Sequence, residues 1–243
     1  MTVRWPWSGG LERRARRAAL PAALRARLQR LRDELRLGHG RQARRVPIAT
    51  ARLVVVDLET TGPRIDRDRI IAVGAVAVER LALQHADAYA AVLRQPAPSA
   101  HDNILVHQIG GQQQAGGEEP AVALVGFLEF LASTPCVAFR AEFDSTVLAR
   151  ELRIQLGVRA PRRFLDLAVL LPALFPGTQN DTLEDWARHF RIVPIGRHDA
   201  LADAYTTAQL LLIALQAAQA GGARVTGDLL ALERAQLWLG RRR

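Results

Sequence analysis

The order of apolar and polar residues changes its period twice along the chain. Within residues 1–50, leucines recur three and four positions apart, which predicts an amphipathic helix with arginines on its other faces. This stripe consists of Leu20, Leu24, Leu28, Leu31 and Leu35. From Ala51 the pattern becomes a series of short apolar and β-branched runs, and after Pro96 helical and strand patterns alternate.

Strand patterns precede the alternating region, and each later strand is followed by a helical pattern. The predicted strands are Leu53–Val56, Ile70–Val78, Ala86–Leu93, Cys136–Phe139 and Phe164–Leu165. The predicted helices are Glu118–Leu131, Ser145–Leu156, Leu167–Leu174, Thr182–His189, Ala200–Ala217 and a tail helix that begins at Val225. A meander followed by alternating strands and helices predicts a three-layer α/β fold, with a mixed five-stranded sheet flanked by helices.

The segment Gly110–Gly117 is polar and rich in glycine, which predicts a mobile loop. Two roles are open for such a loop. It can be a plain connector, or it can close over a substrate.

Charge is concentrated at the N-terminus. Residues 1–50 hold 13 arginines and 3 acidic residues, whereas residues 51–243 hold 20 arginines and 21 acidic residues. The basic helix can pack on its own domain or on a protein partner, contact a phosphate backbone, or belong to a membrane-surface helix or transit peptide. The chain has no lysine, which excludes a Walker phosphate loop and Schiff-base chemistry.

Length and composition fit one sizeable core with an appendage. The longest apolar stretch, Leu210–Leu215, is far shorter than a membrane span, so we expect no such span and a cytoplasmic protein. The single cysteine, Cys136, excludes an intrachain disulfide, and its apolar neighbours predict an inert, buried strand residue.

Two carboxylates follow the first predicted strand. Side chains two positions apart on a strand share a face, so Asp57 and Glu59 can both point into one site at the end of a central strand. Because ligands in α/β proteins usually bind at strand ends, this position suits metal-binding carboxylates. Taken alone, the pair could equally be two surface acids.

Three further residues occupy comparable positions. Asp144 follows a predicted strand and begins the next helix, where a carboxylate can also be a simple helix cap. His198 is expected on a loop ahead of a helix, with Asp199 near the cap and Asp203 on the inner face. Converging carboxylates repel one another unless they hold divalent cations, and a loop histidine beside them can act as a base near neutral pH. His198 could otherwise be an ordinary exposed histidine.

Four segments in a fixed order resemble a known family. They are D-L-E-T-T-G from Asp57, V-H-Q-I-G from Val106, A-F-R-A-E-F-D ending at Asp144, and H-D-A-L-A-D-A from His198. Together they resemble the DEDDh 3′–5′ exonucleases, which have a ribonuclease-H-like fold and include the proofreading epsilon subunit of bacterial DNA polymerase III, ribonuclease T and oligoribonuclease. The resemblance spans about residues 51–218.

The resemblance implies a site and a chemistry. Asp57, Glu59 and Asp203 would bind one Mg²⁺ or Mn²⁺, Asp57 would bridge to a second ion supported by Asp144, and His198 would deprotonate the attacking water. The remaining implied residues would contact the terminal nucleotide: Thr60, Thr61, Val106, His107 and Phe143. Two positions depart from the family pattern: Phe139-Arg140 stands where His-Asn is common, and Gly110 stands where threonine is frequent.

The resemblance thus predicts that the protein is a metal-dependent exonuclease. We expect it to release nucleoside 5′-monophosphates from single-stranded or frayed 3′ ends, with DNA as the preferred substrate. The alternatives are an RNA-trimming oligoribonuclease and a non-catalytic module that binds nucleic acid or a polymerase. We expect a basic helical extension at residues 1–50, an exonuclease domain at 51–220 and a C-terminal helical tail at 221–243. The basic helix could also bind a polymerase or another protein.

Overall fold

The computed structural model describes residues 16–38, 44–159, 164–178 and 180–240. Three parts of the chain lie outside the described residues: the N-terminal segment that contains Trp5 and Trp7, most of the glycine- and arginine-rich segment Gly38–Arg45, and the terminal arginines Arg241–Arg243. The side chain of Leu35 is also outside them. No helix in the described part of the chain is both long and apolar enough to cross a bilayer.

The predicted sheet is confirmed. Five strands lie in the order β3-β2-β1-β4-β5, and they span Arg52–Thr60 (β1), Ile70–Glu79 (β2), Ala82–Val92 (β3), Cys136–Ala138 (β4) and Phe164–Asp166 (β5). The first three form an antiparallel meander, whereas β1, β4 and β5 run parallel. The carboxyl ends of β1, β4 and β5 therefore meet at one edge of the sheet.

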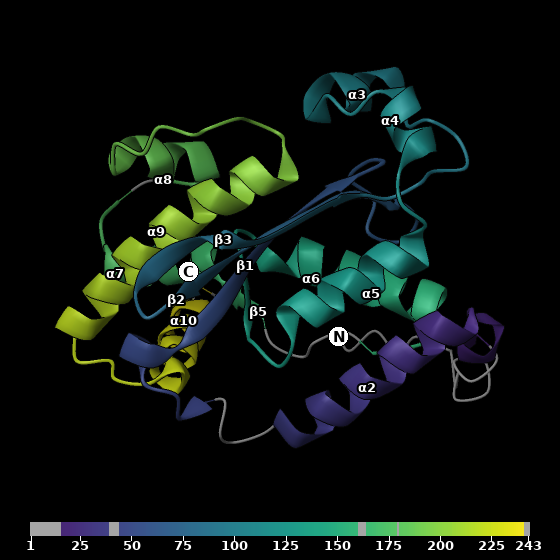
Figure 1. The fold of residues 1–243 in the computed structure, drawn as a ribbon. Helices are drawn as coiled ribbons and strands as arrows, with labels where there is room; N and C mark the ends of the chain where they lie inside the picture. Colours follow the sequence, from purple (N-terminus) through teal and green to yellow (C-terminus); the bar gives the residue numbers. More distant parts are fainter. Residues whose placement is uncertain (1–15, 39–43, 160–163, 179, 241–243) are drawn as a thin grey trace.

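Helices cover both faces of this sheet (Figure 1). The α-helices are α2 (Ala22–Gly38), α3 (His101–His107), α4 (Gly111–Gly116), α5 (Pro120–Leu131), α6 (Ala141–Glu151), α7 (Leu167–Leu174), α8 (Leu183–His189), α9 (Ala200–Ala220) and α10 (Thr226–Gly240). A short 3₁₀ helix, η2 (Ile48–Thr50), precedes β1, and a π-helix, η3 (Leu152–Leu156), continues α6.

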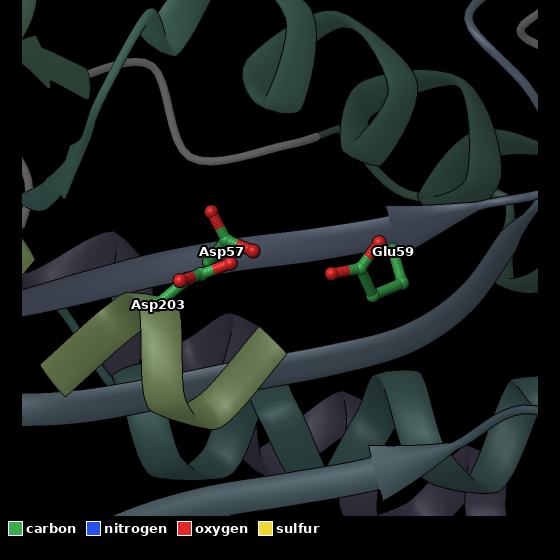
Figure 2. A group of neighbouring side chains, drawn as sticks. All are labelled: Asp57, Glu59 and Asp203. Atoms are coloured by element: carbon green, nitrogen blue, oxygen red, sulfur yellow. The ribbon is translucent and has the colours of Figure 1, made fainter. Parts of the chain in front are cut away.

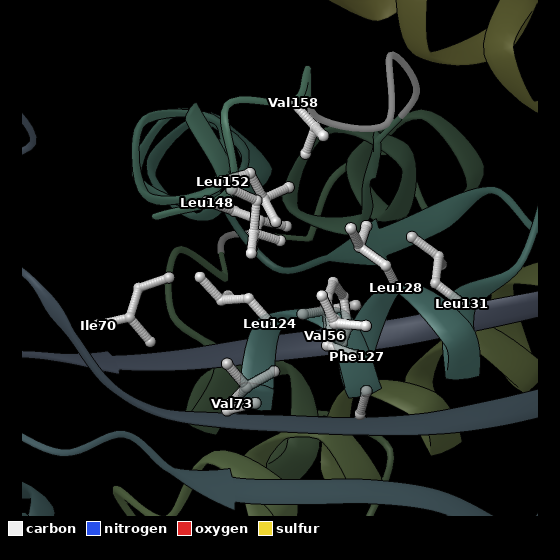
Figure 3. Close-up of a cluster of buried hydrophobic side chains, with 14 of the residues drawn as sticks. Val56, Ile70, Val73, Leu124, Phe127, Leu128, Leu131, Leu148, Leu152 and Val158 are labelled. Carbon is white, nitrogen blue, oxygen red and sulfur yellow. The ribbon is translucent and has the colours of Figure 1, made fainter. Parts of the chain in front are cut away.

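Alternation along β1 explains the three layers. Val54 and Val56 belong to a buried cluster with α5 and α6, part of which Figure 3 shows, whereas Leu53 and Val55 belong to a second cluster with α7 and α9. Each face of the sheet is apolar because successive side chains point to opposite sides. The fold is thus an α/β sandwich of helices, sheet and helices, as predicted.

The two terminal helices pack on this domain. Leu24, Leu28 and Leu31 of α2 are buried in the cluster of α5, and Leu229 of α10 is buried in the cluster of α9. An ion pair from Arg27 to Glu129, with 2.5 Å between Nη2 and Oε2, adds to the contact of α2 with α5. These three leucines of the predicted amphipathic helix are therefore packed within the molecule. The division of the chain at residues 50 and 220 stays a prediction.

The segment between β3 and α5 differs from the prediction. Residues 111–116 form the short helix α4, in which Gln114 is buried and donates hydrogen bonds to Ser99 and to the Ile109 carbonyl. The predicted mobile loop is thus wrong for most of Gly110–Gly117, because a buried amide side chain orders a glycine-rich sequence that lacks helical periodicity.

Candidate active site

Strand β1 brings two of the predicted carboxylates to one face. Asp57 and Glu59 continue the alternation of Leu53 and Val55, so both side chains lie on the face covered by α9, as Figure 2 shows. They lie within the strand rather than after it, since β1 extends to Thr60. The predicted shared face is confirmed.

Helix α9 supplies the third carboxylate. Asp199 caps this helix by accepting a hydrogen bond from the Ala202 amide at 2.9 Å, which places Asp203 in the first turn. One carboxylate oxygen each from Asp57, Glu59 and Asp203 lies within 4.8 Å of the others. Three oxygen donors at this spacing can bind a single hard divalent cation.

A glycine in β2 allows α9 to approach this closely. Gly74 pairs with Asp57 across the β1–β2 ladder, and a Cβ atom at Gly74 would lie 2.1 Å from the Ala200 carbonyl carbon. The start of α9 thus rests on the bare backbone of β2, beside Asp57. We did not predict this role from the sequence, although a lone glycine inside an apolar strand signals close backbone contact.

The fourth carboxylate, Asp144, lies in the first turn of α6, after β4. It is buried and is not one of the three residues that share the 4.8 Å spacing, but its charge raises the pKa of both Asp57 and Glu59. The helix begins at Ala141, three residues before Asp144, so Asp144 is not the residue that caps it.

The pKa values of these carboxyl groups reflect crowding of like charges in a buried place. Burial and then repulsion from Asp144, Glu59 and Asp203 raise the pKa of Asp57 well above its ordinary range. Burial and repulsion from Asp203 raise the pKa of Glu59 to about 7, and burial raises the pKa of Asp144 to about 7. Burial also raises the pKa of Asp203. A bound divalent cation would relieve this repulsion.

His198 lies on the loop ahead of α9, as predicted. Its backbone is left-handed, with φ of 54°, and its amide donates a hydrogen bond to Asp203 Oδ2 at 3.0 Å. The side chain is exposed. This contact places the histidine next to the three-carboxylate group while leaving its ring in solvent.

The residues predicted to contact substrate occupy varied environments. Thr60 is the last residue of β1, and its hydroxyl donates to the Gly62 carbonyl, whereas Thr61 lies in the connection after β1 and its hydroxyl donates to Asp68. Val106 is exposed on α3, but His107 is buried, with Nδ1 accepting from the Ile109 amide at 3.0 Å. Phe143 is half-buried against the α5–α6 cluster. Their contact with substrate stays a prediction.

Helix α3, which we did not predict, is tied to the end of β1. The Asn103 side chain donates to the Thr60 carbonyl at 2.7 Å. The exposed Val106 is therefore carried on a helix anchored next to Glu59. A short helix with a weak apolar pattern leaves little signal in the sequence.

Comparison with known proteins places the chain among nucleases. Residues 54–211 match the RNase_T exonuclease family model. The chain is 26% identical over 178 residues to the PolC-type DNA polymerase III of Caldanaerobacter subterraneus subsp. tengcongensis, and this match covers 72% of the chain and 12% of that protein. It is 27% identical over 175 residues to the 3′-5′ exonuclease DinG of Staphylococcus aureus, covering 68% and 18% of the two proteins.

A solved structure shares the fold. Exonuclease X in complex with 5′ overhanging duplex DNA superposes with a TM-score of 0.57 at 21% identity, covering 73% of this chain and 98% of that one. The chain spans less than a fifth of the length of the curated relatives named above. Because the family match extends over more than half of the chain and contains Asp57, Glu59, Asp144, His198 and Asp203, the protein belongs to the RNase_T exonuclease family.

Proposed function

We propose that this protein is a DEDDh-type 3′–5′ exonuclease that hydrolyses phosphodiester bonds at DNA 3′ ends and releases nucleoside 5′-monophosphates. One observation carries the proposal: Asp57, Glu59 and Asp203 converge within 4.8 Å, beside Asp144, in a chain of an exonuclease family. The similarity to polymerase III and to a DNA-bound exonuclease fold favours DNA over RNA.

The donor set fits Mg²⁺ or Mn²⁺. Asp57, Glu59, Asp144 and Asp203 offer oxygen only, which hard divalent cations prefer, and no thiolate or imidazole belongs to the three-residue group. We assign Asp57, Glu59 and Asp203 to one ion and Asp57 with Asp144 to a second. Bound ions would lower the pKa of the attacking water and neutralise charge on the phosphodiester oxygens.

His198 supplies the base in this proposal. Its exposed ring lies on a loop pinned to Asp203 through the backbone amide, so the ring can reach a water at the carboxylate group. With metal bound, the four carboxylates would act as ligands, whereas an imidazole can take up a proton near neutral pH. His198 would thus remove the proton from the attacking water and pass it to solvent.

The terminal nucleotide would lie between β1 and α3. Thr60 and Thr61 follow Glu59 directly, and Val106 is exposed on the helix that Asn103 ties to Thr60. We propose that Val106 and Phe143 pack against the base or sugar, and that the buried His107 supports this contact by holding the end of α3, where its Nδ1 accepts a hydrogen bond from the Ile109 amide. The backbone of Thr60 and Thr61 would follow the sugar and phosphate.

The outer face of α2 is proposed as a further contact for nucleic acid. Leu24, Leu28 and Leu31 are buried, whereas Arg25 and Arg30 are exposed. Removal of residues 1–50 would uncover the core, so Arg25→Gln with Arg30→Gln is the better test. A salt dependence of DNA binding that flattens in this double variant supports phosphate contact, and an unchanged slope favours a protein partner such as a polymerase.

One assay tests the activity. The purified protein is incubated with Mg²⁺ or Mn²⁺ and with 3′- and 5′-labelled DNA and RNA, both paired and unpaired. We expect stepwise release of mononucleotides from 3′ ends, faster on DNA. Asp57→Ala should abolish this release, while Asp66→Ala, which removes an exposed carboxylate paired with Arg64, should leave it unchanged. Equal activity of Asp57→Ala would contradict the proposal, and faster cleavage of RNA would reverse the substrate preference.

A further inference from the structure

A fifth carboxylate, Asp166, connects the starts of two helices. It lies at the end of β5 and accepts hydrogen bonds from the backbone amides of Arg140 at 3.0 Å, Ala141 at 3.1 Å and Ala168 at 2.9 Å. The first two amides open α6, and the third opens α7. One side chain thus caps both helices, satisfying amides that have no partner within their own helices.

This double cap determines where Asp144 lies. Asp144 is three residues after Ala141, in the same first turn of α6. Strands β4 and β5 are parallel neighbours, and Ala138 at the end of β4 pairs with Asp166. The position of the first turn of α6, and with it Asp144, is therefore tied to the end of β5 through Asp166.

Helix α10 holds Asp166 from the other side. The backbone amide of Asp166 donates a hydrogen bond to Glu233 Oε1 at 2.7 Å, and Glu233 is half-buried. The helix is itself anchored, because Leu229 is buried in the α9 cluster and the Thr226 amide donates to the Val46 carbonyl at 3.0 Å. Figure 1 shows α10 beneath the sheet near β5, and the helix lies outside the matched residues 54–211.

We propose that Asp166 and Glu233 are positioning residues that fix Asp144 beside Asp57, and that α10 is consequently part of the active-site framework. The chain of contacts runs from Glu233 through the Asp166 backbone and carboxylate to the first turn of α6. This inference rests on the proposed function in taking Asp144 as a metal-binding residue. Neither Asp166 nor Glu233 touches substrate or metal in this scheme.

Two substitutions at Asp166 separate positioning from general stability. Serine is a good N-cap, so Asp166→Ser can keep the cap of α7 but is too short to reach the amides of Arg140 and Ala141. Asp166→Ala removes both caps. We expect Mn²⁺ binding, measured by titration calorimetry without substrate, to weaken about 10-fold in both variants, as for other residues that orient a ligand. The thermal midpoint should fall more in Asp166→Ala.

Matched variants at Glu233 test the link to α10. Glu233→Gln keeps an oxygen that can accept the hydrogen bond from the Asp166 amide, so it should bind Mn²⁺ like the wild type. Glu233→Ala removes the acceptor and should weaken binding, though less than the changes at Asp166. Glu129→Gln, a carboxylate change on α5 that only breaks the pair with Arg27, is the control and should leave Mn²⁺ binding unchanged.

Hydrogen exchange gives a second measurement that needs no metal. The amides of Phe143 and Asp144 should exchange faster in Asp166→Ser than in the wild type, because the start of α6 loses two hydrogen bonds. Unchanged Mn²⁺ affinity and unchanged exchange in Asp166→Ser would overturn the inference and leave Asp166 a purely stabilising residue. A wild type that bound no Mn²⁺ would instead refute the proposed function, and the exchange rates alone would then decide whether Asp166 positions α6.

Discussion

We expect substitution of Gly74 by alanine to disable the active site, although Gly74 has no side chain that could take part in the reaction. The added Cβ would lie 2.1 Å from the carbonyl carbon of Ala200, 2.2 Å from the amide nitrogen of Leu201 and 2.3 Å from the carbonyl oxygen of Ala200. Ordinary contact begins at 3.4 Å, so the shortest separation has to grow by about 1.3 Å. All three atoms belong to the backbone, and no side-chain rotation can relieve the clash.

The start of α9 must therefore move away from β2 or β2 must bend. Asp203 lies one turn after Ala200, so either movement separates its carboxylate from Asp57 and Glu59. A displacement of about 1 Å at a catalytic constellation lowers the rate by about 100-fold. Overpacking of this kind also destabilises a protein by about 1–3 kcal/mol.

Three measurements on Gly74→Ala test this argument: the rate of nucleotide release, the Mn²⁺ affinity by calorimetry and the urea midpoint. Gly116→Ala is the matched control, because no atom lies within 4 Å of the Cβ position at Gly116. We expect a large loss of rate and affinity in Gly74→Ala and none in Gly116→Ala. Wild-type rate and Mn²⁺ affinity in Gly74→Ala would refute the idea that the contact of α9 with Gly74 positions Asp203.

Three further predictions concern the base, the metal and α2. His198→Ala should lower the rate by about 10²–10⁴-fold while leaving Mn²⁺ affinity unchanged, because the histidine is not one of the three converging carboxylates. A parallel loss of affinity would argue against a base role. The metal-free protein should lose stability as pH rises from about 4.5 to about 7. The reason is that folding raises the pKa of Asp57, Glu59 and Asp144, so the folded state binds more protons than the unfolded state in this range. Thermal midpoints with and without Mn²⁺ should show greater stabilisation by the ion at pH 8 than at pH 5. Leu28→Ala should destabilise the protein by about 2–5 kcal/mol in urea titrations because Leu28 is buried against α5, and a change below about 0.5 kcal/mol would show that α2 is not docked.

Local geometry explains which parts of the site were predictable. The alternation of a strand places Asp57 and Glu59 on one face, and a polar residue before an apolar helix marks Asp199 as the cap that leads to Asp203. Each of these rules acts over a few residues. The location of His198 on the loop ahead of α9 followed from the same kind of pattern.

By itself, the sequence determined the elements of the sheet, the shared face of its first two carboxylates and the order of the motifs. Only the tertiary structure decided how closely α9 approaches β2 at Gly74 and that Glu233 of α10 reaches Asp166. It also decided that Leu24, Leu28 and Leu31 of α2 are buried against α5. The physical reason is that periodicity fixes directions within one element. The distance between residues such as Asp57 and Asp203, 146 positions apart, depends on how whole layers pack, which no local pattern encodes.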